Sequence, residues 1–305
     1  PFFKYAEPLL RAAIQTSTHY FDICDDWEPT EKMLQMNEEA KKANITAIIG
    51  LGASPGLTNI LAQIAISELD EVTKVYTGWD MSSAKPESES SQSGVNAAMV
   101  HGIEQMIGKV KIFKNRNFEM VKPLEKIKID YPDIGESSAY IFGHPEAITL
   151  PHNYPDITES YNLMHGSERG FIGILKIIRF LINFKIITKN FAAKILTRLE
   201  SLNTSDRKED KHVHLPSIYS YAEGVKEKKI TSIGVTIDGD INSFSMGEAT
   251  SLPLVTGVRM FIDGKIKKHG VHTPESPIID PKIFFNYFKK GMGGNNELNT
   301  IITKK

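Results

Sequence analysis

The sequence predicts an α/β protein in which a parallel, doubly wound sheet is followed by a region of antiparallel strands and helices. Helical and strand-like segments alternate over the first seventy residues, which is the rhythm of parallel strands joined by right-handed crossovers. Between residues 109 and 237, alternating and β-branched residues instead indicate hairpins. The two patterns together predict two units of different architecture.

The order of helices and strands over residues 1–69 predicts the second half of a Rossmann-like sheet. The first half of that sheet would precede Pro1. The segments that predict the second half are a helix with Pro8 in its first turn, a strand over 19–23, a helix opened by Pro29, a strand over 45–49 and a helix over 57–65.

The second unit is expected to be α+β. Its strands come in pairs joined by turns that contain Pro and Gly, and helices interrupt them. The expected strands cover 72–79, 109–122, 126–142, 214–225 and 229–237, with a Ser/Glu/Pro loop over 82–93 and helices over 94–106 and 171–187. Two more helices, over 251–262 and from Asp280 onward, close the chain, and 270–275 is expected to form a turn.

Composition excludes several function classes. The chain has 305 residues, a net charge of −1 and a pI near 6.9, which gives no electrostatic case for nucleic-acid binding. A single cysteine, Cys24, excludes an internal disulfide framework and favours a cytoplasmic setting. The scattered histidines lack metal-ligand spacing, so no metal site is expected. Hydrolase Gly-x-Ser-x-Gly and Walker motifs do not occur.

Residues 171–187 form the most apolar stretch of the chain. Three charged residues lie within it, so it does not suit a membrane span. We favour a buried or subunit-interface helix, which predicts a homodimer, over a helix that lies on a membrane surface.

The turn over residues 50–56 is the strongest local signal. It joins an apolar strand to a helix, and ligands in open α/β sheets sit beyond the carboxyl ends of strands. A plain connection without a ligand is the alternative. Asp22, at the end of the preceding strand, is the acid/base candidate of this unit, with a solvated or helix-capping aspartate as the alternative. Cys24 is expected to be a packing residue.

Several blocks of sequence resemble the saccharopine dehydrogenase-like oxidoreductases, and they occur in the family's order over nearly the whole chain. The blocks are Pro1–Tyr5, Ala12–Ile14, His19–Asp22, the Gly-Ala-Ser-Pro-Gly-Leu-Thr-Asn turn at 52–59, Gly143–Pro151 and Gly264–Glu275.

The resemblance implies a Rossmann domain that binds NAD or NADP, formed here by residues 1–69 and 250–305, with an inserted α+β substrate and dimerisation domain over 70–249. Members of the family make or oxidise a C–N bond of an amino-acid or amine substrate by hydride transfer. The alternative is a non-catalytic relative that keeps the fold as an interaction or membrane-surface module. The family's G-x-G-x-x-G loop would precede Pro1, so weak cofactor binding is expected of residues 1–305.

The resemblance also implies roles for individual residues. The cofactor side is expected to involve Pro1, Phe2, Gly52, Ser54 and Pro55, and the substrate side Ser54, Asn59 and His144. His101, on a helix that the family points toward the cleft, joins Asp22 as a catalytic candidate, whereas Glu146 is expected to hold a turn. Saccharopine reductases carry an Asp where this chain has Ser54, which counts against a saccharopine substrate. Carboxylate clamps are sought among Arg116, Arg169 and Arg259.

Overall fold

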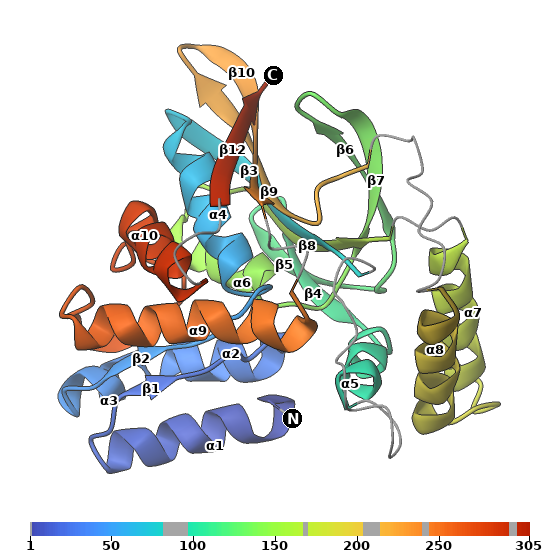
Figure 1. The fold of residues 1–305 in the computed structure, drawn as a ribbon, viewed down its shortest axis with the longest axis horizontal. Helices are drawn as coiled ribbons and strands as arrows, with labels where there is room; N and C mark the ends of the chain where they lie inside the picture. Colours follow the sequence, from blue (N-terminus) through green and yellow to red (C-terminus); the bar gives the residue numbers. More distant parts are fainter. Residues whose placement is uncertain (1, 82–96, 167–169, 204–213, 240–243, 293–297) are drawn as a thin grey trace.

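The computed structural model describes residues 2–81, 97–166, 170–203, 214–239, 244–292 and 298–305. The predicted α/β class is confirmed: two separate sheets are present, and helices pack against both (Figure 1). Pro1, the 82–93 loop and the first residues of the helix predicted from 94 lie outside the described residues.

The smaller sheet is parallel, in the order β1-β2-β11. Its strands are β1 (Tyr20–Phe21), β2 (Thr46–Ile48) and β11 (Gly270–His272). β2 is entirely buried in the centre, as expected for an apolar, β-branched run in a parallel sheet. The helices that accompany it are α1 (Phe2–Gln15), α2 (Trp27–Gln35) and α3 (Asn37–Lys42).

The larger sheet is mixed, and nine strands of it fall within the described residues. Its path runs β12-β10-β9-β3-β8-β4-β5, and the hairpin of β6 and β7 joins through β8. β3 pairs in parallel with β8 but antiparallel with β9. The strands are β3 (Glu71–Asp80), β4 (Val110–Lys114), β5 (Asn117–Val121), β6 (Lys126–Tyr131), β7 (Gly135–Ile141), β8 (Glu159–His165), β9 (Ile218–Lys226), β10 (Lys229–Gly239) and β12 (Leu298–Lys304).

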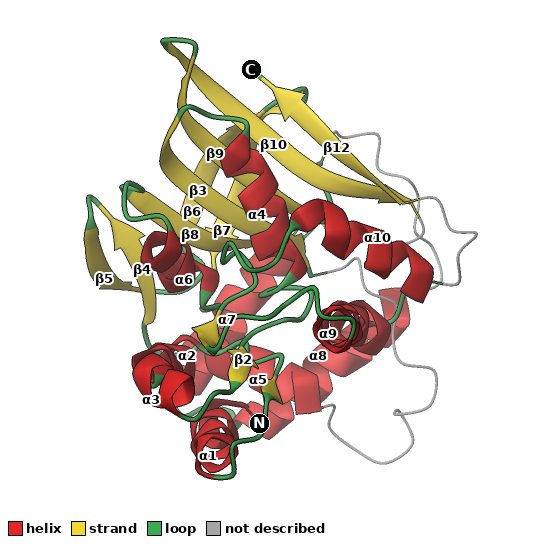
Figure 2. Cartoon of the chain, turned by 90° about the vertical axis from the view of Figure 1, so that its left-hand side faces the viewer, coloured by secondary structure: helices red, strands yellow, loops and turns green. Residues whose placement is uncertain are grey.

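Helix α4 (Leu57–Ser67) connects the two sheets. It begins in the turn after β2 and packs along β3, β9 and β10, as Figure 2 shows. Its buried residues join those of α9 (Met246–Ile262) and α10 (Pro281–Gly291) in one core with the larger sheet. Most of the surface of α4 is apolar, so the helix must be buried against neighbouring elements on more than one side.

Several elements assigned to the predicted unit of residues 1–69 and 250–305 therefore pack with the other unit. They are α4, α9 and α10, which join the core of the larger sheet, and β12, which pairs with β10 over seven residues. β12 is an edge strand that gains its hydrogen bonds from β10, and its adjacent Ile301 and Ile302 are both exposed, so its own residues do not show the alternation that would predict a strand.

The local predictions differ from the structure in three further places. Residues 270–275 begin with β11 rather than a turn, because this short segment gains its hydrogen bonds from β2. Helix α6 (Glu146–Asn153) was not expected between two prolines, and β8 was not expected at all. The helix predicted over 171–187 ends at Asn183, and α8 (Lys189–Asn203) follows it.

Helices α5 (Ala97–Gln105), α7 (Phe171–Asn183) and α8 form a separate layer at one side of the molecule (Figure 1). Leu175, Ile178 and Leu196 are buried in a cluster that also includes Phe142 and Met164 of the larger sheet. Within the described residues, no helix is both long enough and apolar enough to cross a membrane.

Candidate functional site

The carboxyl ends of the three parallel strands meet at one edge of the smaller sheet. The segments that leave this edge are 22–26 after β1, 49–56 after β2 and 273–276 after β11. Helix N-termini and backbone N–H groups at such an edge are the usual ligand-binding position of an open parallel sheet. Most of the chemistry predicted from the sequence lies here.

The turn after β2 is compact and places Ser54 at its tip. Gly52 N donates to Pro55 O at 2.9 Å, and Gly56 has a φ of +123°. A Cβ at Gly56 would lie 2.0 Å from Gly52 O, so this position requires glycine. Ala53 and Ser54 stay partly exposed, while Pro55 is buried.

The Ser54 hydroxyl is the centre of a polar cluster that links the two sheets. Its Oγ donates to Glu146 Oε1 at 2.6 Å and lies 3.2 Å from His144 Nδ1. Asn162 on β8 donates from Nδ2 to Ser54 Oγ at 3.1 Å and to Glu146 Oε1 at 3.0 Å. Ser54 therefore has a fixed orientation although it reaches solvent.

Glu146 is fully buried at the first turn of α6. Its Oε1 also accepts from Thr58 Oγ1 at 2.8 Å, so three donors surround one oxygen. Oε2 has no hydrogen-bond partner within the described residues. The helix N-terminus and these donors together stabilise a buried carboxylate. The expectation that Glu146 holds a turn understated its role, because it orients Ser54.

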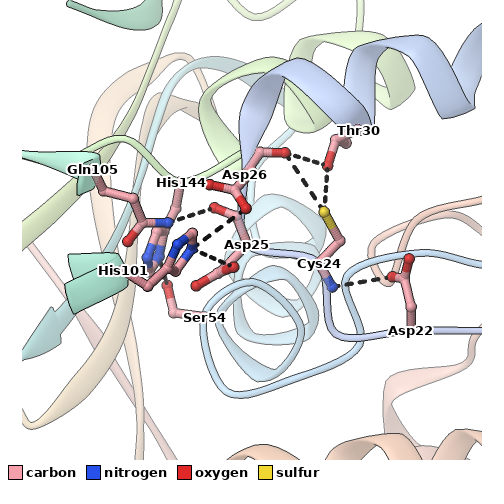
Figure 3. Close-up of polar contacts among 9 residues, drawn as sticks. All are labelled: Asp22, Cys24, Asp25, Asp26, Thr30, Ser54, His101, Gln105 and His144. Carbon is pink, nitrogen blue, oxygen red and sulfur yellow. Dashed lines mark hydrogen bonds and ion pairs between the residues drawn. The ribbon is translucent and has the colours of Figure 1, made fainter. Parts of the chain in front are cut away.

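A second cluster joins α5 to the segment after β1. His101 Nε2 lies 3.2 Å from Asp25 Oδ1 and 3.3 Å from Asp26 Oδ2 (Figure 3). Burial opposes protonation of His101, but the two carboxylates raise its pKa to about 10. Burial likewise disfavours the charged form of Asp25, yet the hydrogen bond with His101 holds the pKa of that carboxyl below its ordinary value. His101 is thus an imidazolium at neutral pH.

The two clusters are within electrostatic range of each other. The charge of His144 also lowers the pKa of Asp25, and Figure 3 shows His144 and Ser54 on the same side of Asp25 as His101. The His144 ring stacks on Trp79, with centroids 5.4 Å apart, which fixes its plane. Asp25, Asp26, Ser54 and His101 are all partly exposed, so a ligand at this edge reaches them.

Asp22 lies apart from this group, on the far side of Cys24 in Figure 3. Its Oδ1 accepts from Gly50 N at 2.7 Å and Cys24 N at 3.1 Å, and its Oδ2 accepts from Tyr20 Oη at 2.8 Å. Burial raises its pKa, and these three donors oppose the rise. All its described contacts tie β1 to the start of the turn. The structure does not bring this predicted catalytic residue to Ser54 or His101.

Asn59 is buried and serves the turn from within α4. Its Oδ1 accepts from Gly56 N at 2.8 Å, and its Nδ2 donates to Glu275 Oε2 at 2.9 Å. Glu275 is fully buried, which raises its pKa, and its Oε1 accepts from Asn153 Nδ2 at 3.1 Å. Asn59 was predicted to bind substrate, but its side chain faces this interior network.

The remaining predicted residues contribute little to the described site. Pro1 lies outside the described residues, and Phe2 begins α1. Arg116 is exposed in the β4–β5 turn and Arg259 pairs with Asp263 at the surface, so neither clamps a ligand at this edge, whereas Arg169 lies outside the described residues.

Among the described residues, Asp25, Asp26 and His101 have ligand atoms within 4.8 Å of one another, the separation expected around a metal ion. This grouping was not expected from the spacing of the histidines in the sequence, because its members come from segments 76 positions apart.

Comparison with known proteins places this geometry in context. No family model matches the chain. The carboxyaminopropylagmatine dehydrogenase of Synechocystis sp. is 22% identical over 298 residues, covering 90% of this chain and 72% of that protein.

Two solved structures share the fold. Apo saccharopine dehydrogenase (L-Glu forming) from Saccharomyces cerevisiae has a TM-score of 0.56 at 13% identity, covering 98% of this chain and 83% of that one. Homospermidine synthase from Legionella pneumophila, solved with NAD, has a TM-score of 0.53 at 11% identity, covering 98% and 73%. The chain is thus similar in sequence to this dehydrogenase and shares the fold of saccharopine dehydrogenase and homospermidine synthase.

Proposed function

We propose that the protein is an NAD(P)-dependent oxidoreductase that acts by hydride transfer at a C–N bond of an amino-acid or amine substrate. The observation that carries the proposal is the position of Ser54: an oriented, solvent-accessible hydroxyl at the carboxyl edge of a parallel sheet, beside the ion-paired His101. The dehydrogenase relative and the neighbour solved with NAD support a nicotinamide cofactor.

The residues at the turn suit such a cofactor. Gly52, Ala53 and Ser54 are small, and the last two reach solvent, so a flat ring can approach the backbone here. The cofactor, when bound, supplies or accepts the hydride. The side chains around it bind the substrate, orient it and hold the accompanying proton.

His101, Asp25 and Asp26 determine the local net charge at the site where the substrate would bind. One imidazolium and two carboxylates leave a net negative charge, which favours an ammonium or iminium group over a carboxylate. The proton on His101 Nε2 lies between Asp25 and Asp26, where it can be exchanged with a substrate nitrogen. We therefore assign amine recognition to these three residues.

The test is to follow the absorbance of NADH and NADPH with the full-length gene product and a panel of amines and their carbonyl precursors. Ser54→Ala is expected to lower kcat/KM by about 10- to 100-fold. Ser67→Ala, at the exposed end of α4, is the matched control and should leave kcat/KM unchanged.

Two results would contradict the proposal. If the folded full-length protein neither binds nor turns over reduced nicotinamide, the reaction class is wrong. If Ser54→Ala retains full activity in a protein that does turn over cofactor, the reaction class stands but the turn is not its centre.

The non-catalytic alternative required exposure of the apolar face of residues 171–187 together with scattered site residues. Side chains on that face are exposed, as described below, and of the three site residues Ser54 and His101 lie in neighbouring clusters while Asp22 lies apart. The neighbouring Ser54 and His101 favour the enzymatic role, and the exposed face supports a surface-binding role beside it.

A further inference from the structure

We propose that α7 and α8 dock the protein on the surface of a membrane that contains anionic lipid. The proposal rests on the surface chemistry of these two helices and is independent of the proposed reaction. Both lie at one side of the molecule, at the right of Figure 1.

The first observation is an exposed apolar face. α7 buries Leu175 and Ile178 on one side, while the opposite side leaves large apolar side chains in water. Phe180 is 54% exposed and Phe184 66% exposed. We call this surface the apolar face; its members are Ile174, Ile177, Phe180, Phe184, Ile186 and Phe191. Clusters of this kind mark interaction sites.

The second observation is the charge around that face. Residues 171–203 contain six basic residues and one acid, although the whole chain has a net charge of −1. The basic residues are Lys176, Arg179, Lys185, Lys189, Lys194 and Arg198. Lys189 pairs with Glu104 and Arg179 donates to Pro123 O, whereas Lys185 and Lys194 are exposed. Apolar side chains flanked by cations match the boundary between anionic headgroups and acyl chains. A second copy of this chain would instead bring these cations against one another.

The third observation is a hollow at the start of α7. It has a volume of about 440 Å³ and is lined by Ser138, Tyr140, Gly170, Ile172 and Lys176, among others. Lys176 Nζ lies 5.2 Å from the Tyr140 ring centroid. A lysine, a hydroxyl and the first turn of a helix are groups that bind phosphate oxygens, so this hollow offers contacts of the kind that a lipid headgroup uses.

The length of α7 indicates how it binds. Thirteen residues span about 20 Å, against about 30 Å for the hydrocarbon core. Its inner side is held by packing against α5, α8 and the larger sheet. The helix therefore lies in the plane of the headgroups.

The test is flotation of the full-length protein with vesicles of phosphatidylcholine alone and of phosphatidylcholine with 30% phosphatidylglycerol. The protein should float with the anionic vesicles and be released by salt. Phe180→Ser/Phe184→Ser is expected to reduce the partition coefficient by about tenfold or more. Lys185→Gln/Lys194→Gln should reduce it by about fivefold per lysine, on the anionic vesicles only.

A matched control removes equivalent groups elsewhere. Lys229→Gln/Ile230→Ser changes an exposed lysine and an 84% exposed isoleucine on β10, and it should float like the wild type. Circular dichroism and the thermal midpoint verify folding of each variant, because every changed side chain is exposed. Equal binding to neutral and anionic vesicles, or no binding, overturns the proposal. So does a dimer in light scattering that the phenylalanine variant dissociates, because the apolar face would then join two copies.

Discussion

Replacing Asp25 by Asn tests the electrostatic basis of the candidate site. The carboxylate lies 3.2 Å from His101 Nε2, and with Asp26 it raises the pKa of that imidazole to about 10. The rise above the ordinary value of 6.5 corresponds to about 5 kcal/mol for both carboxylates together. Removing one of them, at side chains that are still 17% and 26% exposed, is expected to cost about 2 kcal/mol.

The pH dependence gives the prediction its sign. The folded state keeps a proton on His101 that the unfolded chain releases above pH 6.5, because the folded pKa is the higher one. The stabilisation is therefore complete below pH 6.5 and disappears as the pH rises through about 10. Wild type and Asp25→Asn should differ most at pH 6 and converge near pH 10.

Two measurements check this prediction. NMR titration of the His101 ring proton, assigned with His101→Gln, should give a pKa that falls in Asp25→Asn. Urea unfolding at pH 6 and pH 9.5 should give the difference in free energy, and Asp156→Asn, at an exposed position, serves as the control. A wild-type His101 that titrates near 6.5, or a titration unaffected by Asp25→Asn, would refute the assigned ion pair.

Three further predictions concern folding at the same edge of the sheet. Gly56→Ala should lower the free energy of unfolding by about 3 kcal/mol or more, because its Cβ would overlap the backbone of Gly52. Gly102→Ala is the control: the space around Gly102 is open, so this variant should match or exceed the wild type in urea unfolding. Glu146→Ala should cost about 2 kcal/mol, because the buried Thr58 hydroxyl loses its acceptor and Ser54 and Asn162 each lose one of theirs. Glu146→Gln should cost less because it keeps an acceptor, and equal losses in urea unfolding would argue against the network. Cys24 is buried and burial raises its pKa, so a thiol reagent at pH 8 should label it only after unfolding, and rapid labelling of the native protein would contradict its placement.

The sequence was sufficient to predict those helices and strands that are determined by the pattern of their own residues. The strand over 45–49, its turn and the helix after it were found because apolar periodicity changes at glycine and proline. The hairpin of β9 and β10 was found in the same way. β11 and β12 were missed because their hydrogen bonds come from strands at least 59 residues away, which local patterns do not encode.

For the candidate site, too, the sequence predicted residues in locally recognisable turns but not the partners that the fold brings to them. Ser54 was identified from its turn, and the structure places it at the accessible tip. Asp22 was predicted from its place after a strand, but only the fold pairs the neighbouring Asp25 with a histidine 76 positions later. Glu146 and Asn162 were missed as partners of Ser54, because spacing in the chain does not show which buried polar groups must satisfy each other.

The buried hydrogen bonds around α4 connect the three sequence blocks on which the resemblance rests. The blocks around 52–59, 143–151 and 264–275 converge on the first turn of α4, where Glu146 accepts from Thr58 and Glu275 accepts from Asn59. A change in one block would leave a buried donor or carboxylate unpaired in another, at a cost of about 1–3 kcal/mol or more. These three blocks therefore depend on one another for folding. Under the proposed function, we expect substitutions of the accessible Ser54 and His101 to change which substrate is used, and substitutions of the buried Glu146 and Glu275 to lower stability instead.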